Sequence, residues 1–154
     1  MSLTERLLTM LNSHSTAEVP ALYAADYSGV DVTDRSRVQG HAEVVKQLER
    51  LWLAFPDLCF ESAPPIMQKN RVALYWIARG THRGTVLNIP PTGRQIAING
   101  VTLLRIKHNQ ISHALFLWDM AALLRDLGLL PELDYRTPSV PMSFEETLTL
   151  FNAA

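Results

Sequence analysis

Asp119 occupies the position in this sequence that most directly suggests chemistry. It follows the apolar run LFLW at 115–118, and a helical pattern begins at Met120. Asp is a preferred N-cap residue, because its side chain accepts a hydrogen bond from a free amide of the first helical turn. A carboxylate that faces an apolar pocket can instead give and take protons as a general acid or base. The sequence leaves both roles open.

Two histidines could assist an acid/base at Asp119. His113 shares strand parity with Asp119 and Leu117, so we expect it on the same face unless a bulge intervenes. His82 belongs to an earlier strand pattern. An imidazole near the carboxylate could stabilise a substrate oxygen on which negative charge develops. A histidine among apolar residues is more often structural, so a structural role also stays open for both.

Four further side chains are expected to surround a small apolar ligand. Trp52, Trp76 and Phe116 are aromatic, and aromatic walls suit flat ligands, although such residues also form ordinary cores. Leu117 lies two positions before Asp119 and has the same parity. We therefore predict a substrate pocket that these residues line.

Asn99 and Arg105 share one face of the strand that precedes Asp119. Whether that face is also the face of Asp119 depends on the turn between the two strands, because a shift of one residue reverses every side chain. A two-residue turn at His108-Asn109 would place both residues opposite Asp119, and a three-residue loop would place them beside it. The sequence leaves this choice open, with both residues as candidate pocket residues.

Metal-binding and hydrolase motifs are missing from the sequence. The five histidines show no HxH, HxxxH or HExxH spacing. There is no GxSxG motif, and Cys59 has no evident catalytic partner. The sequence therefore predicts no metal site and no nucleophilic hydrolase.

Composition bounds the class of protein. The chain has 154 residues, of which 47% are hydrophobic and 19% charged, and its net charge is −1. These values indicate one globular domain without a basic face, so we expect neither a nucleic acid nor a membrane as partner. No apolar stretch reaches the roughly 18–20 residues that span a bilayer. The N-terminus lacks the apolar segment of a signal peptide, and the single cysteine suits a reducing compartment. We therefore expect a cytoplasmic protein.

Hydrophobic periodicity places these residues on an ordered set of elements. Two capping boxes, Ser2 to Glu5 and Ser15 to Glu18, predict two N-terminal helices. They are followed by an irregular strand and a helix that Pro56 ends. We then expect strands at 58–68, 71–83, 95–107 and 110–118, and a last helix at 120–127. This order predicts an α+β fold, in which helices pack on the concave face of a strongly curved antiparallel sheet. Such a cone has an interior pocket.

Five local motifs, in this order, resemble the SnoaL-like family, which is named for polyketide cyclases and belongs to the nuclear-transport-factor-2-like superfamily. They are AFPDL at 54–58, GTHRG at 80–84, PPTGR at 90–94, KHNQI at 107–111 and the pattern D-xxx-LL-xx-LG at 119–128. The resemblance covers about residues 3–131. It implies a nuclear-transport-factor-2-like, cystatin-like cone over residues 1–131.

The resemblance also implies how the site works. Family cyclases use one carboxylate as acid/base at the end of the last strand, and Asp119 is the matching position here. His82 falls within the family-like GTHRG motif. No metal, no cofactor and a homodimer through the outer sheet face are implied. The family's aspartate-glycine turn is replaced by His108-Asn109, and its frequent glutamate and tryptophan by His113 and Leu115.

Residues 132–154 lie outside the resemblance. Their prolines and the capping box of Ser143 and Glu146 predict a linker and a short helix. We expect this extension to pack on the domain or on its dimer partner.

The first functional hypothesis is a cofactor-free cyclase that closes a ring by an intramolecular aldol reaction, with Asp119 moving the proton. An epoxide hydrolase would need a second inward carboxylate bridged by an arginine, and none is evident. An isomerase of the ketosteroid type would need an early-helix tyrosine, but Tyr23 comes late. In a non-catalytic, ligand-binding dimer, Asp119 would only cap the helix.

Overall fold

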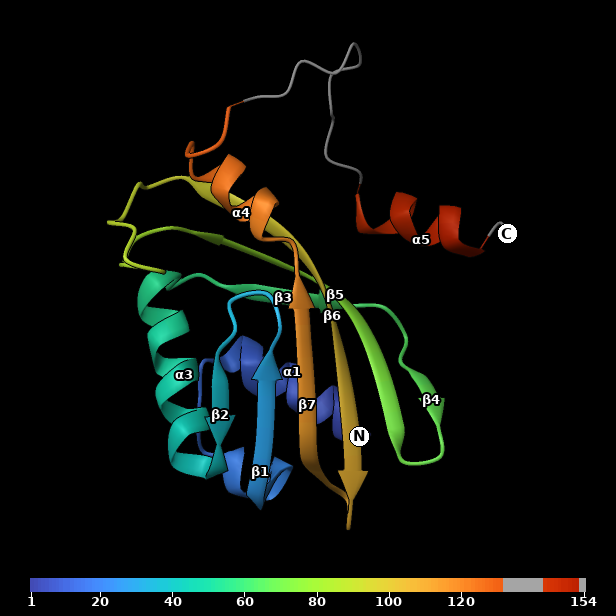
Figure 1. Cartoon of the computed structure of the whole chain (residues 1–154). Coiled ribbons are helices and arrows are strands. Elements are labelled where there is room, and N and C mark those ends of the chain that lie inside the picture. The colour runs from blue at the N-terminus through green and yellow to red at the C-terminus, as the bar shows by residue number, and fades with distance from the viewer. Residues whose placement is uncertain (132–142, 153–154) are drawn as a thin grey trace.

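The computed structural model describes residues 1–131 and 143–152 (Figure 1). Its helices are α1 (Leu3–Ser13), α2 (Val19–Leu22), α3 (Gly40–Ala54), α4 (Met120–Asp126) and α5 (Phe144–Asn152). Its strands are β1 (Tyr23–Asp31), β2 (Arg37–Gln39), β3 (Cys59–Ser62), β4 (Ile66–Gln68), β5 (Arg71–Thr81), β6 (Gln95–Lys107) and β7 (Gln110–Trp118). The predicted α+β class is confirmed. The order of elements is as expected, except that the irregular strand before α3 is two strands, β1 and β2, and the strand expected at 58–68 is two, β3 and β4.

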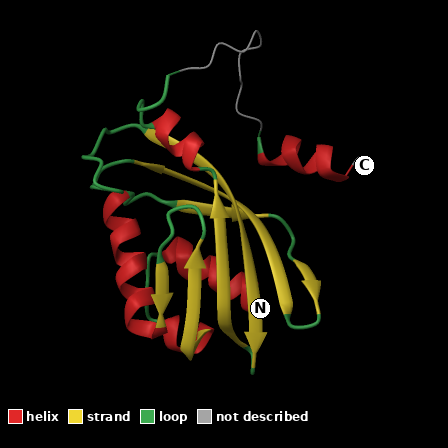
Figure 2. Ribbon diagram, in the orientation of Figure 1, coloured by secondary structure: helices red, strands yellow, loops and turns green. Residues whose placement is uncertain are grey.

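The strands form one curved, unclosed sheet in the order β2-β1-β7-β6-β5-β3, and β4 pairs with β5 beside this path. The helices α1 and α3 lie on the same side of this sheet, α1 behind it and α3 along its β2 edge (Figure 2). All neighbouring pairs are antiparallel except β1 and β7, which are parallel. The parallel pair corrects the prediction of an antiparallel sheet. It brings together the first and the last strand of the chain, which are far apart in sequence.

Of the two capping boxes predicted at the N-terminal helices, one forms and one does not. The capping box of Ser2 and Glu5 forms at α1. The second box does not form: α2 begins only at Val19, and its N-cap Glu18 makes no side-chain cap bond. Pro20 stands at the start of this four-residue helix, so only one turn is left before β1 begins. None of the helices in the described segments is long and apolar enough to span a membrane.

The hairpin between β6 and β7 decides which side chains face the core. Its turn has two residues, since Lys107 pairs with Gln110 while His108 and Asn109 adopt positive φ. A bulge follows at once, because Ile106 pairs with Ile111 but Arg105 pairs with His113. The bulge shifts the register by one residue, which is the effect that a three-residue loop would have had. Odd-numbered residues of both strands beyond the bulge therefore share one face.

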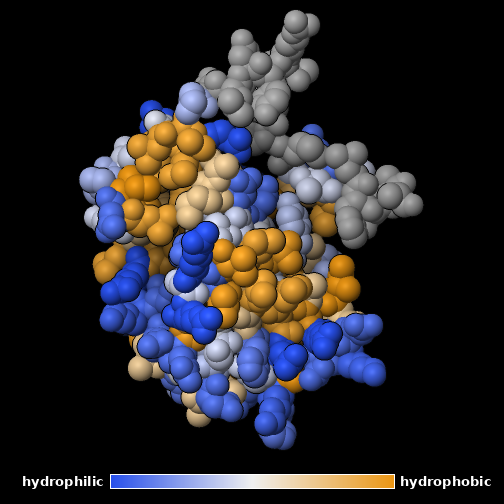
Figure 3. All heavy atoms as spheres, viewed as in Figure 1, coloured by the Kyte–Doolittle hydropathy of each residue, from blue (hydrophilic) through white to orange (hydrophobic). Residues whose placement is uncertain are grey.

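That face is the outer one, away from α1 and α3. The even-numbered side chains of β5 and β6 are buried or half-buried on the concave side. They join two core clusters, one with α1 and β1 and one with the end of α3 and α4, and the half-buried rings of Trp52 and Trp76 pack against both. The outer face instead exposes a contiguous apolar patch over β6 and β7 (Figure 3). Its exposed members are Val101, Leu103, Leu115 and Leu117.

Candidate functional site

Asp119 caps α4 and is exposed. Its Oδ1 accepts a 2.8 Å hydrogen bond from the amide of Ala122. Its own amide donates to the carbonyl of Asn99 at 3.0 Å, so the β6–β7 ladder extends one residue past β7. The capping geometry that the sequence allowed is therefore present, and the side chain lies at the surface rather than among apolar groups.

The other sequence-predicted residues do not lie in one place. His113, Asn99, Arg105 and Leu117 are all exposed on the outer sheet face. Arg105 and His113 are direct cross-strand neighbours there. His113 and Leu117 share one face of β7, as predicted. Because of the bulge beside Arg105, that face is the outer one and not the concave one.

The aromatic candidates lie on the opposite, concave side. Trp52, Trp76 and Phe116 are half-buried and pack against the core clusters. The sheet therefore separates the polar candidates on its outer face from the aromatic candidates inside.

His82 is completely buried in a loop cluster just beyond the end of β5. Its Nδ1 accepts a hydrogen bond from the amide of Thr92 at 3.2 Å and lies 3.0 Å from the Thr92 hydroxyl. Its backbone pairs with Arg94 and Gly93. Because Nδ1 is an acceptor, Nε2 carries the ring proton, and this atom has no hydrogen-bond partner among the described residues. The motifs GTHRG and PPTGR are thus bonded to each other through this histidine.

The motif AFPDL joins the same cluster. Asp57 accepts hydrogen bonds from the amide and the hydroxyl of Thr81, both at 2.6 Å. These bonds hold the pKa of the Asp57 carboxyl below its usual value. The amides of Arg83 and Gly84 donate to the carbonyl of Ala54 at the end of α3, where a side chain at Gly84 would overlap the α3 backbone. The three motifs therefore anchor the C-terminal turn of α3 to the sheet and so position Trp52.

Asp31, the last residue of β1, is a half-buried carboxylate that the sequence did not single out. Its Oδ2 accepts a 2.8 Å hydrogen bond from the indole nitrogen of Trp118. Its Oδ1 accepts from the amides of Thr33 at 2.9 Å and Asp34 at 3.3 Å. Burial raises the pKa of the Asp31 carboxyl above its ordinary value, and the bonds from Trp118 and the two amides offset only part of this effect.

Strand pairing places Asp31 on the concave face. It is the register partner of Phe116, whose side chain packs on the first core cluster. Trp118 is the register partner of Gly100. A side chain at Gly100 would overlap the Trp76 ring, so that ring lies over this glycine. The carboxylate therefore stands beside the half-buried aromatic rings of Trp118 on β7 and Trp76 on β5, with Gly100 of β6 between these two residues.

Trp52 faces this interior from α3. Its ring stacks on His14 with centroids 5.2 Å apart, and His14 in turn bonds through Nε2 to the carbonyl of Leu58 at 2.7 Å. The indole nitrogen of Trp52 is buried and has no hydrogen-bond partner among the residues that the structure describes. A buried N–H without a partner costs free energy, so a bound water or ligand is its expected acceptor.

The signal that could have found Asp31 is short. The sequence DVTD at 31–34 favours a turn in which an aspartate side chain accepts backbone amides two and three residues on. Its burial depends on Trp118, eighty-seven positions away, and no local pattern reveals that contact.

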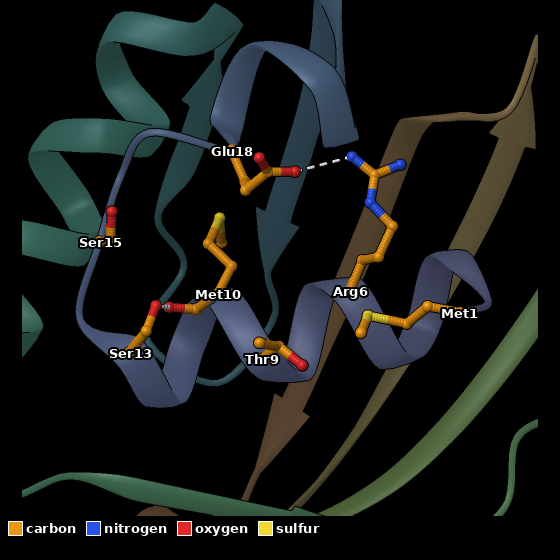
Figure 4. A pocket seen from close by; sticks show the side chains of 7 residues that line it. All are labelled: Met1, Arg6, Thr9, Met10, Ser13, Ser15 and Glu18. Carbon is orange, nitrogen blue, oxygen red and sulfur yellow. Dashed lines mark hydrogen bonds and ion pairs between the residues drawn. The ribbon is translucent and has the colours of Figure 1, made fainter.

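A pocket of about 270 Å³ lies between α1 and the segment that leads to α2 (Figure 4). Arg6 and Glu18 point toward each other beside it and form a 2.7 Å ion pair. The rest of its lining is serine, threonine and methionine: Met1, Thr9, Met10, Ser13 and Ser15. None of the candidate residues lines it, and its one carboxylate is already paired.

Comparison with known proteins gives one family match. The model of the SnoaL-like polyketide cyclases matches residues 2–127. The fold is similar to that of AclR from Streptomyces galilaeus, a proposed hydroxylase, with a TM-score of 0.73 and 26% identity over 84% of this chain and 95% of AclR. It is also similar to a proposed SnoaL-like polyketide cyclase from Jannaschia sp. CCS1, with a TM-score of 0.75 and 17% identity over 84% of this chain and 91% of that one. IdmH from Streptomyces antibioticus, a proposed polyketide cyclase, is similar as well. Its TM-score is 0.72 and its sequence identity 20%, over 82% of this chain and 96% of IdmH. No curated protein matches the sequence significantly.

Proposed function

Because the chain belongs to the family of SnoaL-like polyketide cyclases, we propose that it is an acid/base enzyme that closes a ring on a small apolar or polyketide-like substrate without a cofactor. One observation carries the proposal. The Asp31 carboxylate is half-buried, has a raised pKa and stands beside the aromatic rings of the concave face. An acid/base works best when its pKa lies near the operating pH, and a raised carboxyl pKa moves in that direction.

The reaction is an intramolecular aldol addition. Asp31 takes a proton from a carbon between two carbonyl groups, and the resulting enolate carbon attacks a carbonyl carbon of the same molecule. A carbon–carbon bond forms, and the electron pair of the attacked carbonyl becomes an alkoxide. The protonated Asp31 returns its proton to that alkoxide, which gives a hydroxyl group. Atoms and electrons balance without an oxidant or a metal ion.

Asp31 suits this role better than Asp119. An ionised carboxylate has about four acceptor positions. The three bonds to Asp31 leave one position on Oδ2 for the substrate proton. Asp119 is exposed and its Oδ1 is engaged by the cap of α4, so water screens its charge. We therefore assign the acid/base role that the family uses to Asp31 and the capping role to Asp119.

Trp52 supplies a donor for the developing negative charge. Its indole N–H is buried and lacks a partner in the described part of the chain. A fixed donor near a forming enolate or alkoxide stabilises the transition state more than it stabilises the substrate. The rings of Trp76 and Phe116 would then support the flat part of the substrate.

A matched pair of variants tests the proposal. Asp31→Asn keeps the size of the side chain and an oxygen for the amides of Thr33 and Asp34, but it does not accept a proton. Asp119→Asn keeps the cap of α4. With a linear aromatic β-keto ester that carries a further ketone group as substrate, we expect Asp31→Asn to lower kcat by at least about 100-fold, the usual contribution of a general acid/base. Asp119→Asn should stay close to the wild type.

Two further results bear on the proposal. Trp52→Phe keeps the ring but removes the N–H, and we expect it to lower kcat more than it raises KM. A wild-type protein that binds such esters but never converts them would contradict an enzymatic role. It would leave the ligand-binding alternative.

A further inference from the structure

β1 carries Tyr27, Gly29 and Asp31 on the concave side of the sheet. Residues two positions apart on a strand face the same side. Gly29 pairs with Ala114 and Asp31 pairs with Phe116, and both of these partners pack in or against the first core cluster. Tyr27 belongs to that cluster too and is 1% exposed. A buried phenol therefore shares a strand face with the proposed acid/base.

The phenol of Tyr27 lies over Gly29. A Cβ atom at Gly29 would overlap the phenol oxygen and would lie 2.9 Å from the ring carbon that carries it. Gly29 is not one of the glycines with a positive φ, so its backbone does not require glycine. The ring above it does. The phenol oxygen thus occupies the place that a side chain at position 29 would take.

The phenol points along β1 toward Asp31, because Gly29 lies between the two residues on the same face. Positions two apart on a strand are separated by about 6.8 Å, so the phenol oxygen lies about 6.8 Å from the Cβ atom of Asp31. A carbonyl group and the carbon beside it fit between the two side chains. The hydroxyl then contacts the carbonyl oxygen, while the carboxylate contacts the hydrogen on the neighbouring carbon.

The Tyr27 hydroxyl is a fixed donor. The ring of Tyr23 packs edge-on against the Tyr27 ring, with centroids 4.9 Å apart and planes at 82°. Burial and, to a smaller extent, Tyr23 raise the pKa of the Tyr27 phenol above its ordinary value, so it keeps its proton at neutral pH. Among the hydrogen bonds of the described residues, the tyrosine hydroxyl that takes part is that of Tyr75. The Tyr27 hydroxyl is therefore left to water or a ligand, since a buried tyrosine hydroxyl usually has a partner.

We propose that the Tyr27 hydroxyl donates a hydrogen bond to the substrate oxygen on which negative charge develops when Asp31 takes the proton. As the C–H bond breaks, its electron pair forms the carbon–carbon double bond of the enolate, and the carbonyl electron pair moves onto the oxygen. The proton goes to Asp31, and Tyr27 keeps its own. Tyr27 is then a second catalytic residue. The inference rests on the catalytic role proposed for Asp31.

A neutral donor is what the interior offers to this charge. The buried polar residues in the described segments are Thr81, His82, Thr102 and Ser112, with no lysine or arginine among them. A donor held in place before the reaction stabilises a developing oxyanion without reorganisation. Tyr27 shares β1 with Asp31 and so serves the enolate oxygen, which leaves the N–H of Trp52 on α3 for the alkoxide at the attacked carbonyl.

Deuterium exchange from solvent at the carbon between the two carbonyls of a β-keto ester tests the assignment. Tyr27→Phe keeps the ring and removes the hydroxyl, and we expect it to slow the exchange at least about 10-fold while KM changes less than about threefold. Tyr23→Phe is the matched control, because it removes a buried hydroxyl from the same strand and should leave the rate unchanged. Gly29→Ala keeps the hydroxyl but puts a methyl group in its place, so it should slow the exchange as well.

Binding of 4-nitrophenolate locates the donor without turnover. This planar aromatic anion carries its charge on an oxygen, as an enolate does, and Asp31→Asn removes the carboxylate charge that would repel it. We expect the Asp31→Asn protein to bind 4-nitrophenolate. Adding Tyr27→Phe should weaken the binding at least about 10-fold, the effect of one hydrogen bond to a charged group, and adding Tyr23→Phe should not. Urea unfolding of both tyrosine variants checks that they are folded.

The outcomes separate Tyr27 from Asp31. Equal exchange rates in folded Tyr27→Phe and Tyr23→Phe proteins would overturn the assignment of Tyr27. So would an Asp31→Asn protein that does not bind the phenolate, or one that binds it equally well without the Tyr27 hydroxyl. Exchange by Asp31→Asn at the wild-type rate, together with phenolate binding that depends on Tyr27, would contradict the role proposed for Asp31 and leave Tyr27 as the donor.

Discussion

The indole nitrogen of Trp118 donates a 2.8 Å hydrogen bond to Oδ2 of Asp31. The bond joins the ends of β1 and β7, the parallel pair of the sheet, in which Asp31 and Phe116 are register partners. It holds the carboxylate beside the concave face and lowers the pKa that burial has raised. The position and the acidity of the proposed acid/base thus depend on the same contact.

Trp118→Phe should therefore change the pH dependence of ring closure. It removes the hydrogen bond that stabilises the charged form of Asp31, so the pKa of this carboxyl rises further. Activity needs the deprotonated form, and we expect the acidic limb of the kcat/KM profile to move to higher pH. Trp76→Phe removes an indole that bonds to Thr102 instead, and it should leave the limb in place. If the acidic limb of the Trp118→Phe profile stays at the wild-type pH, Asp31 is not the group whose protonation controls the reaction.

The pH dependence of stability offers a second check on Asp31. Its folded pKa lies above the unfolded value, so the folded state retains the proton to higher pH. The stability that Asp31 contributes is fully present below the unfolded pKa of about 3.9 and is lost as pH rises through the folded value. The Tm of the wild type minus that of Asp31→Asn should therefore fall as pH is raised from below about 4 toward neutrality. Thermal unfolding of both proteins across that range measures the difference, and a rising difference would contradict the raised pKa.

The loop cluster of the family motifs predicts a loss of stability at Asp57. Asp57→Ala removes both hydrogen bonds to Thr81 and should lower the free energy of unfolding by about 1–3 kcal/mol. The exposure of the carboxylate favours the lower end of this range. Urea unfolding measures the change. Asp26→Ala changes an exposed position of β1 and should stay within about 0.5 kcal/mol of the wild type. An equal loss of stability in both variants would show that the hydrogen bonds of Asp57 to Thr81 do not stabilise the fold.

The cap of α4 gives a simple prediction for Asp119. Asp119→Ala removes the acceptor of the Ala122 amide and should cost about 1 kcal/mol of stability, whereas Asp119→Asn should cost little. Chemical denaturation of the two variants at low protein concentration, where any dimer dissociates, separates the cap from association. Equal stabilities would show that the cap contributes nothing.

Much of the fold could be predicted from local patterns. The capping box at Ser2, the turn at His108-Asn109 and the end of α4 before Gly128 each depend on residues within a few positions of one another. The box at Ser15 failed because Pro20 and the start of β1 leave room for one helical turn only. Local chemistry thus predicted the elements well where no tertiary constraint shortened them.

The site could be predicted less well, because its residues depend on distant contacts. The bulge next to Arg105 changes which residues of β7 share a face with those of β6, and nothing in the hairpin sequence distinguishes a bulged pair from a regular one. It puts His113 and Leu117 on the same outer face as Asn99 and Arg105, and it puts Phe116 on the concave face. Asp31 became a candidate only through its pairing with the end of β7. Parity along a strand predicts which residues share a face, but the contacts across the sheet decide which face is buried.

Proton abstraction can be measured apart from ring closure. A β-keto ester that lacks the further carbonyl group attacked in ring closure keeps the acidic carbon between its two carbonyls. It can lose its proton but has nothing to attack, so deuterium exchange from solvent at that carbon reports this step alone. We predict that the wild type and Asp119→Asn accelerate the exchange, and that Asp31→Asn lowers the rate at least about 100-fold. Exchange by Asp31→Asn at the wild-type rate would contradict the assignment of Asp31 as the acid/base.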